Sequence, residues 1–90
     1  MVVIAELAAS AVPGFDAYER RVLPLLARHD GRLERRLRTA DARTELHVVS
    51  FPDREGYLAY LADPDRQTLR PLLAGVEVTQ RVLEVDDVPD

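Results

Sequence analysis

The chain has 90 residues, 47% of them hydrophobic and 31% charged, which is the composition of a single globular domain. Its 12 basic and 16 acidic side chains give a net charge of −4, which argues against a nucleic-acid partner. There is no cysteine, so disulfides, thiolate catalysis and cysteine-bound metals are excluded. A chain this short hides only about two-thirds of its unfolded surface on folding, and small domains often gain stability by associating.

The N-terminal residues MVVIAELAAS predict no targeting segment. They lack the positive charge that opens a signal peptide, and Glu6 interrupts their apolar run. No apolar run approaches the roughly 20 residues needed to span a bilayer. We therefore expect a cytoplasmic protein with no membrane partner.

The first half of the chain changes from a strand pattern to a helix pattern. Residues 2–9 are rich in Val and Ile and predict a strand, before Pro13-Gly14 interrupts the chain. Pro24 should kink the helix that follows, and Asp30-Gly31 should end it with the glycine in the left-handed conformation. Apolar steps of three and four predict a buried stripe on this helix, made of Phe15, Tyr18, Val22, Leu25 and His29.

A strand pair is predicted next. Residues 32–38, RLERRLR, alternate so that Leu33, Arg35 and Leu37 should share one face, and their charge suits a sheet edge. These arginines could bind an anion, but solvated charge is the simpler interpretation. The loop TADAR connects them to a far more apolar strand at residues 44–51.

Two prolines divide the region after this strand. Pro52 and Asp53 predict a helix start, and Asp63-Pro64 predicts that the helix breaks there and restarts. Residues 76–85 alternate as a final strand, and the acidic residues 86–90 are expected to form a loose tail. The apolar side chains expected to face the core from the broken helix are Tyr57, Leu58, Tyr60, Leu61, Leu69, Leu72 and Leu73.

The element order is therefore β-α-β-β-α-β, the ferredoxin-like α+β pattern, in one domain spanning residues 1–90. Right-handed crossovers would place four antiparallel strands in the order 4-1-3-2, with both helices on one face. The two central strands are nevertheless apolar on both faces. We therefore expect a homodimer in which a second copy covers the open sheet face, the alternative being a tolerated scatter of exposed apolar residues.

Two segments carry a resemblance to a known superfamily. YERRVLPLLARHDGRLERR is a proline-interrupted helix that turns into a strand, and VVSFPDREGYLAYLADPDRQTLRPL runs strand, Phe-Pro, helix, Asp-Pro, helix. Together they resemble the dimeric α+β barrel superfamily, which includes the antibiotic-biosynthesis monooxygenases and small stand-alone families of unassigned activity. The resemblance implies a dimeric barrel, and its monooxygenase members bind substrate between helices and sheet without a metal or flavin cofactor.

This sequence departs from the better understood members of that superfamily. The haem-degrading relatives use Asn, Trp and His, whereas this chain has neither Asn nor Trp. The absence disfavours haem degradation, and it weakens the analogy with quinone-forming monooxygenases, whose polar pocket also contains Trp and Asn.

His47 and Glu6 are the candidate catalytic residues. Each occupies the middle of a predicted central strand, so they could meet on one sheet face, with Arg81 or Gln80 supplied by the last strand. A histidine beside a carboxylate would suit general-base work near neutral pH. The alternative is a structural polar pair in the dimer interface or at a solvated sheet margin. Two histidines without a third ligand predict no metal site.

Tyr18 and Tyr60 are candidate substrate-binding residues, together with Arg81. Tyr18 could point its hydroxyl into a helix–sheet cavity, and Tyr60 lies near the helix break, where the cavity would open. The alternative, which the sequence favours for Tyr18, is a core aromatic whose hydroxyl lies near the surface.

Two functions stay open at this point. One is a small-molecule-binding protein or cofactor-independent monooxygenase- or cyclase-like enzyme acting on a hydrophobic, aromatic or polyketide-like substrate. The other is a non-catalytic dimeric module for ligand binding or assembly. A cavity of several hundred Å³ lined by Tyr18 and His47 would favour the first.

Overall fold

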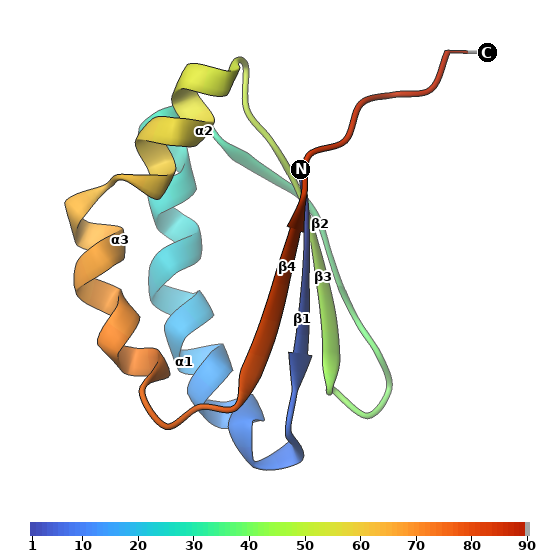
Figure 1. The fold of residues 1–90 in the computed structure, drawn as a ribbon, viewed down its shortest axis with the longest axis vertical. Coiled ribbons are helices and arrows are strands. Elements are labelled where there is room, and N and C mark those ends of the chain that lie inside the picture. The colour runs from blue at the N-terminus through green and yellow to red at the C-terminus, as the bar shows by residue number, and fades with distance from the viewer. Residues whose placement is uncertain (90) are drawn as a thin grey trace.

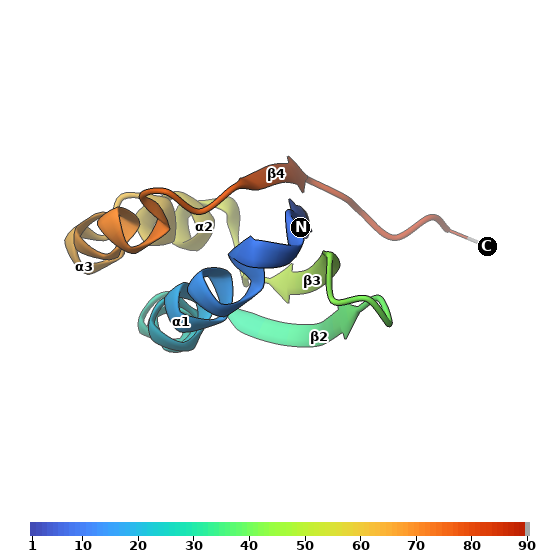
Figure 2. The same ribbon diagram turned by 90° about the horizontal axis from the view of Figure 1, so that it is seen from below.

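The computed structural model describes residues 1–89, which fold into one four-stranded antiparallel sheet with helices on one face (Figures 1 and 2). The spatial order is β2-β3-β1-β4, which is the predicted order counted from the opposite edge. Asp90, the last residue of the predicted tail, lies outside the described residues. The strands are β1 (Val2–Leu7), β2 (Arg32–Arg38), β3 (Thr44–Ser50) and β4 (Val78–Leu83).

The first helical segment changes its winding where proline occurs. A short 3-10 turn, η1 (Ala9–Ala11), leads into α1 (Val12–Val22), and the chain continues as the 3-10 segment η2 (Leu23–His29). Pro24 lies at the start of η2. Because proline has no N–H to donate, the α-helical ladder is interrupted there and the tighter winding takes over.

The turn that ends η2 corrects one prediction. Asp30, and not Gly31, adopts the left-handed conformation, with φ 57° and ψ 22°. Short polar residues tolerate this region. Gly31 is instead required for space, because a Cβ on it would lie 2.7 Å from Cε1 of Phe51.

Both predicted helix starts in the second half are confirmed. Asp53 caps α2 (Arg54–Leu61), its side chain accepting a hydrogen bond from the N–H of Gly56. Asp63 caps α3 (Pro64–Leu69) by accepting from the N–H of Asp65, and a 3-10 turn, η3 (Arg70–Leu73), follows.

The core lies between the helices and the sheet in two clusters. The larger cluster joins α1, η2 and α2 to β3 and is centred on Tyr18, Val22 and Tyr60. The smaller cluster surrounds Phe15. Leu58 and Leu72 were expected in this core but are 49% and 39% exposed. Leu58 lies two residues from the buried Tyr60, roughly 200° around the helix, and Leu72 belongs to a 3-10 turn that rotates it outward.

A register shift in β2 corrects the predicted alternation of that strand. Leu33 pairs with Val49, whereas Arg35 pairs with the next residue, Val48, so the ladder slips between Leu33 and Arg35. Leu33 consequently packs against the larger core cluster, and Leu37 pairs with Leu46 and is exposed on the other face. An extra residue reverses the face of everything beyond it because strand side chains alternate with a period of two.

No part of residues 1–89 covers the second face of the sheet, as Figure 2 shows. Apolar side chains of the central strands are only half-buried there, and Leu83 of β4 is exposed. The half-buried residues are Val2, Ile4, Leu46 and Val48. Within the same residues, no helix is both long and apolar enough to cross a membrane.

Candidate functional site

His47 lies at the centre of β3 on the face that the helices cover. It stands opposite Val3 of β1 and Arg36 of β2, and its side chain is only 4% exposed. Its neighbours on the same strand face are Glu45 and Val49, because alternate residues share a face. A central strand of the sheet thus presents an imidazole to the interior of the helix–sheet sandwich.

Two buried carboxylates flank this imidazole. Oε2 of Glu19, on α1, lies 3.7 Å from Nδ1 of His47, and Oε1 of Glu45 lies 3.6 Å from its Nε2. Glu19 is 4% exposed and Glu45 only 1%. Neither contact is short enough to be a hydrogen bond, so the three groups form an electrostatic cluster.

The far end of the cluster is held by arginines of the edge strand. Arg36 Nε donates to Oε1 of Glu45, and Arg38 donates to the same oxygen at 3.3 Å. Arg38 also pairs with Asp16 of α1 at 2.5 Å. The negative charge of the buried Glu45 is therefore balanced by two arginines, whereas Glu19 has no arginine in ion-pair contact among residues 1–89.

The different surroundings separate the titration of these groups. Burial, followed by the negative charge of Glu45, raises the pKa of Glu19 to about 7. Burial also lowers the pKa of His47, an effect that the charge of Glu45 opposes. Near neutral pH the cluster thus combines a neutral imidazole with a carboxyl group that is balanced between its two protonation states.

A small cavity lies beside the cluster. Its volume is about 70 Å³, room for roughly two water molecules, and its polar lining includes Tyr18, Glu19, His47 and Tyr60. Gln80 and Val82 of edge strand β4 also line it, and both are exposed, so the cavity opens to solvent on this side. The volume is well below the roughly 300–1,000 Å³ of ordinary ligand pockets.

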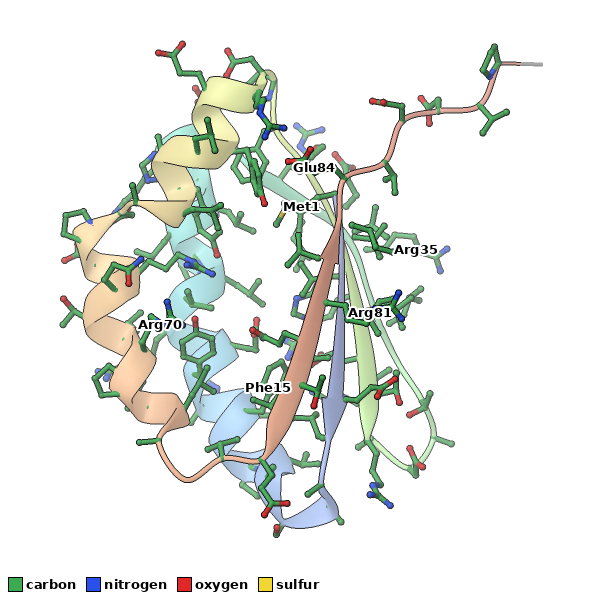
Figure 3. All side chains as sticks on the ribbon, in the orientation of Figure 1. Met1, Phe15, Arg35, Arg70, Arg81 and Glu84 are labelled. Atoms are coloured by element: carbon green, nitrogen blue, oxygen red, sulfur yellow. The ribbon has the colours of Figure 1, made fainter. Side chains whose placement is uncertain are left out.

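The structure brings three of the five predicted site residues together, namely Tyr18, His47 and Tyr60. The expected meeting of Glu6 and His47 is wrong. Glu6 pairs with Thr44, three residues from His47 along β3, and an odd separation places it on the opposite face, where it is exposed. Arg81 pairs with Ile4 and points away from the helices, as Figure 3 shows, so the β4 residues at the cavity are Gln80 and Val82.

Three residues of the site were missed in the sequence. Glu19 continues the buried stripe of α1 at the spacing Phe15, Glu19, Val22, and Glu45 is two residues from His47 on the same strand face. Those two spacings would have identified both carboxylates. Arg66 of α3 also lines the cavity, with Cζ 5.0 Å above the ring of Tyr60. No sequence pattern marked Arg66, because its position depends on how α3 docks.

Residues 1–89 contain no set of side chains arranged to bind a metal ion. No group of three His, Asp or Glu side chains there comes together with the geometry to hold a metal ion.

Solved structures with this fold were found, although no family model and no curated protein matches the sequence. A Nitrosomonas europaea protein named for the antibiotic biosynthesis monooxygenases superposes with a TM-score of 0.69 at 15% identity, over 90% of this chain and 93% of that one. SnoaB of Streptomyces nogalater, a cofactor-independent oxygenase, superposes with a TM-score of 0.66 at 19% identity, over 99% of this chain and 94% of SnoaB. Rv0793 of Mycobacterium tuberculosis superposes with a TM-score of 0.64 at 18% identity, over 98% of this chain and 97% of Rv0793.

These likenesses confirm the predicted fold class. The ferredoxin-like α+β arrangement is the one found in antibiotic biosynthesis monooxygenase-type proteins, as the two quoted segments of the sequence indicated. At identities below 20% the likeness establishes the fold alone. Activity has to be argued from the cavity and its side chains.

Proposed function

We propose that the protein binds a small hydrophobic molecule, aromatic or polyketide-like, in the helix–sheet cavity and acts on it as a cofactor-independent monooxygenase- or cyclase-like enzyme. One observation carries this proposal: the buried Glu19–His47 pair and the hydroxyl-bearing Tyr18 and Tyr60 line the same cavity. The fold shared with a cofactor-independent oxygenase supports the reaction class.

Proton abstraction is the step that this chain's residues suit. A neutral imidazole at His47 can accept a proton from an acidic C–H or O–H of the substrate, and the flanking carboxylates stabilise the imidazolium that forms. Burial raises the pKa of both Tyr18 and Tyr60, so their hydroxyls stay protonated and can donate to a substrate oxygen. In a monooxygenation the substrate carbon then loses two hydrogens and gains one oxygen atom of O₂, while the other oxygen atom leaves as water.

The size of the cavity limits how a substrate can bind. About 70 Å³ accommodates a reacting group but not a polycyclic molecule. The remainder of such a ligand would lie over the exposed rim at Gln80 and Val82. The apolar side chain of Val82 suits that role.

Removal of the base tests the proposal. A panel of anthrones and phenols is screened by protein NMR shifts and by O₂ consumption. His47→Ala should abolish turnover or ligand binding and leave the molecular mass in solution unchanged, with His47→Gln as a less disruptive second variant. Glu55→Gln, at an exposed position of α2, is the matched control and should behave as wild type. Unchanged activity in a folded His47 variant would overturn the proposed role.

A second candidate function is a non-catalytic dimeric module for ligand binding or assembly. The small cavity and the closed Glu45–arginine network favour it, since both leave little space for a substrate. In either case we propose a homodimer that covers the open face of the sheet. No O₂ consumption across the panel would favour this second function over the first, with ligand-induced NMR shifts indicating ligand binding and their absence indicating assembly.

A further inference from the structure

Arg66 is a positive charge at the cavity without a matching negative charge. The arginines that reach the Glu45–His47 cluster from β2, Arg36 and Arg38, form ion pairs with Glu45, but among residues 1–89 no carboxylate forms one with Arg66. Its Nε is buried and has no hydrogen-bond partner within those residues. A guanidinium in this state keeps its donors available to a bound molecule.

The position of Arg66 is fixed by its surroundings. Its Cζ lies 5.0 Å from the centre of the Tyr60 ring, which is a cation–π contact. Helix α3 is held at its first turn by the Asp63 cap, and Asp63 in turn accepts a hydrogen bond from Nε2 of His29 at 2.8 Å. Leu69, three residues beyond Arg66, packs against the larger core cluster.

We infer that the cavity selects a ligand with an acidic oxygen, an enol, a phenol or a carboxylic acid, and that Arg66 binds it as the anion. The inference rests on the proposed function, since it specifies the substrate class of the same cavity. A planar guanidinium binds an oxyanion through two parallel donors, whereas a neutral ether or hydrocarbon offers it nothing comparable.

The charges that face the cavity agree with this selection. Glu19 is the carboxyl group on the lining, and burial followed by the charge of Glu45 raises its pKa to about 7, so below that pH it is protonated and leaves the charge of Arg66 uncompensated. Tyr18 and Tyr60 are neutral donors at neutral pH. An anionic oxygen would therefore meet a guanidinium and two hydroxyls, the arrangement that stabilises an enolate or phenolate.

Binding of 4-nitrophenol tests the inference, with 4-nitroanisole as the neutral probe of similar shape. The yellow nitrophenolate reports ionisation directly, so preferential binding of the anion deepens the colour at constant pH. We expect wild type to prefer nitrophenol over nitroanisole, and Arg66→Gln to lose about tenfold in affinity for the phenolate alone. Arg20→Gln removes the same charge from an exposed site on α1 away from the cavity and should keep the preference. NMR shifts of α3 amides locate the bound probe.

The outcomes separate this inference from the proposed function. If wild type binds both probes equally, or Arg66→Gln keeps the preference, the inference is wrong and the cavity remains a binding site. If neither probe binds, the proposed site fails as well. Arg66→Lys, which keeps the charge without the paired donors, should retain part of the preference and serves if the Gln variant does not fold.

Discussion

Glu19 of α1 faces His47 of β3 across the helix–sheet interface, with 3.7 Å between Oε2 and Nδ1. Each side chain is 4% exposed, and burial favours the neutral form of each. A pair of this kind exchanges a proton at little cost, and it also makes the stability of the fold depend on pH.

Glu19 should make the protein less stable as pH rises. Its pKa is about 7 in the folded state against 4.5 as its ordinary value, so its contribution is fully favourable below about 4.5 and is lost by about pH 7. Glu19→Gln should remove that loss. Between pH 4 and pH 8, the free energy of unfolding of the variant relative to wild type should rise by about 3 kcal/mol.

Urea unfolding at several pH values measures this difference, and Glu55→Gln, on the exposed face of α2, is the control. His47 acts with the opposite sign, because its folded pKa is lowered and its contribution is lost as pH falls. Since His47 is present in both proteins, the comparison with wild type isolates Glu19 to a first approximation. Equal pH profiles for wild type and Glu19→Gln would contradict the assignment.

Glu45 should contribute strongly to stability through its arginine partners. Glu45→Gln would remove the buried carboxylate that Arg36 and Arg38 share and leave them only the more exposed Asp16. Breaking a fully buried pair costs roughly 3–5 kcal/mol, and the partial exposure of both arginines reduces our expectation to about 2 kcal/mol.

Chemical denaturation checks this value, with Glu55→Gln as the matched control. Glu55 is exposed on α2, so its replacement should change stability by less than about 0.5 kcal/mol. A similar loss in the two variants would show that the arginine contacts of Glu45 contribute nothing specific.

The sequence predicted the strand order and both helix starts because these depend on local patterns. Asp53 and Asp63-Pro64 carry their signals within a few residues, and the apolar central strands could pair in few ways. The partner of His47 could not be predicted as securely, because a one-residue difference in register decides which face Glu6 occupies. The residue found there is Glu19, which comes from a different layer.

Asp63 should matter more to the fold than Asp53, although both cap a helix. Asp53 makes one capping bond, to the N–H of Gly56, whereas Asp63 caps α3, accepts from His29 at 2.8 Å and lies 3.7 Å from Arg28. Asp63→Ala should therefore lower the melting temperature more than Asp53→Ala, whose loss should be close to the roughly 1 kcal/mol of a single cap.

The difference between the two variants should also depend on pH. His29, followed by the N–H of Asp65, lowers the pKa of Asp63, so its stabilising effect is present above its ordinary pKa and is lost as pH falls through the lowered value. Thermal melts of both variants at neutral pH and in strong acid check this. The excess destabilisation of Asp63→Ala should disappear in acid, and a pH-independent excess would assign it to packing.

Ile4 should be central to the proposed homodimer. It lies in the middle of β1 on the uncovered face, between Leu46 of β3 and Arg81 of β4, and it is only half-buried. Ile4→Arg should weaken self-association at least about tenfold, because a buried, unpaired charge at the centre of an apolar interface is costly. Sedimentation equilibrium measures the change. Leu58→Arg, which alters an equally apolar but exposed position on α2, should leave the mass unchanged, and a wild-type mass that is monomeric at all concentrations would refute the dimer itself.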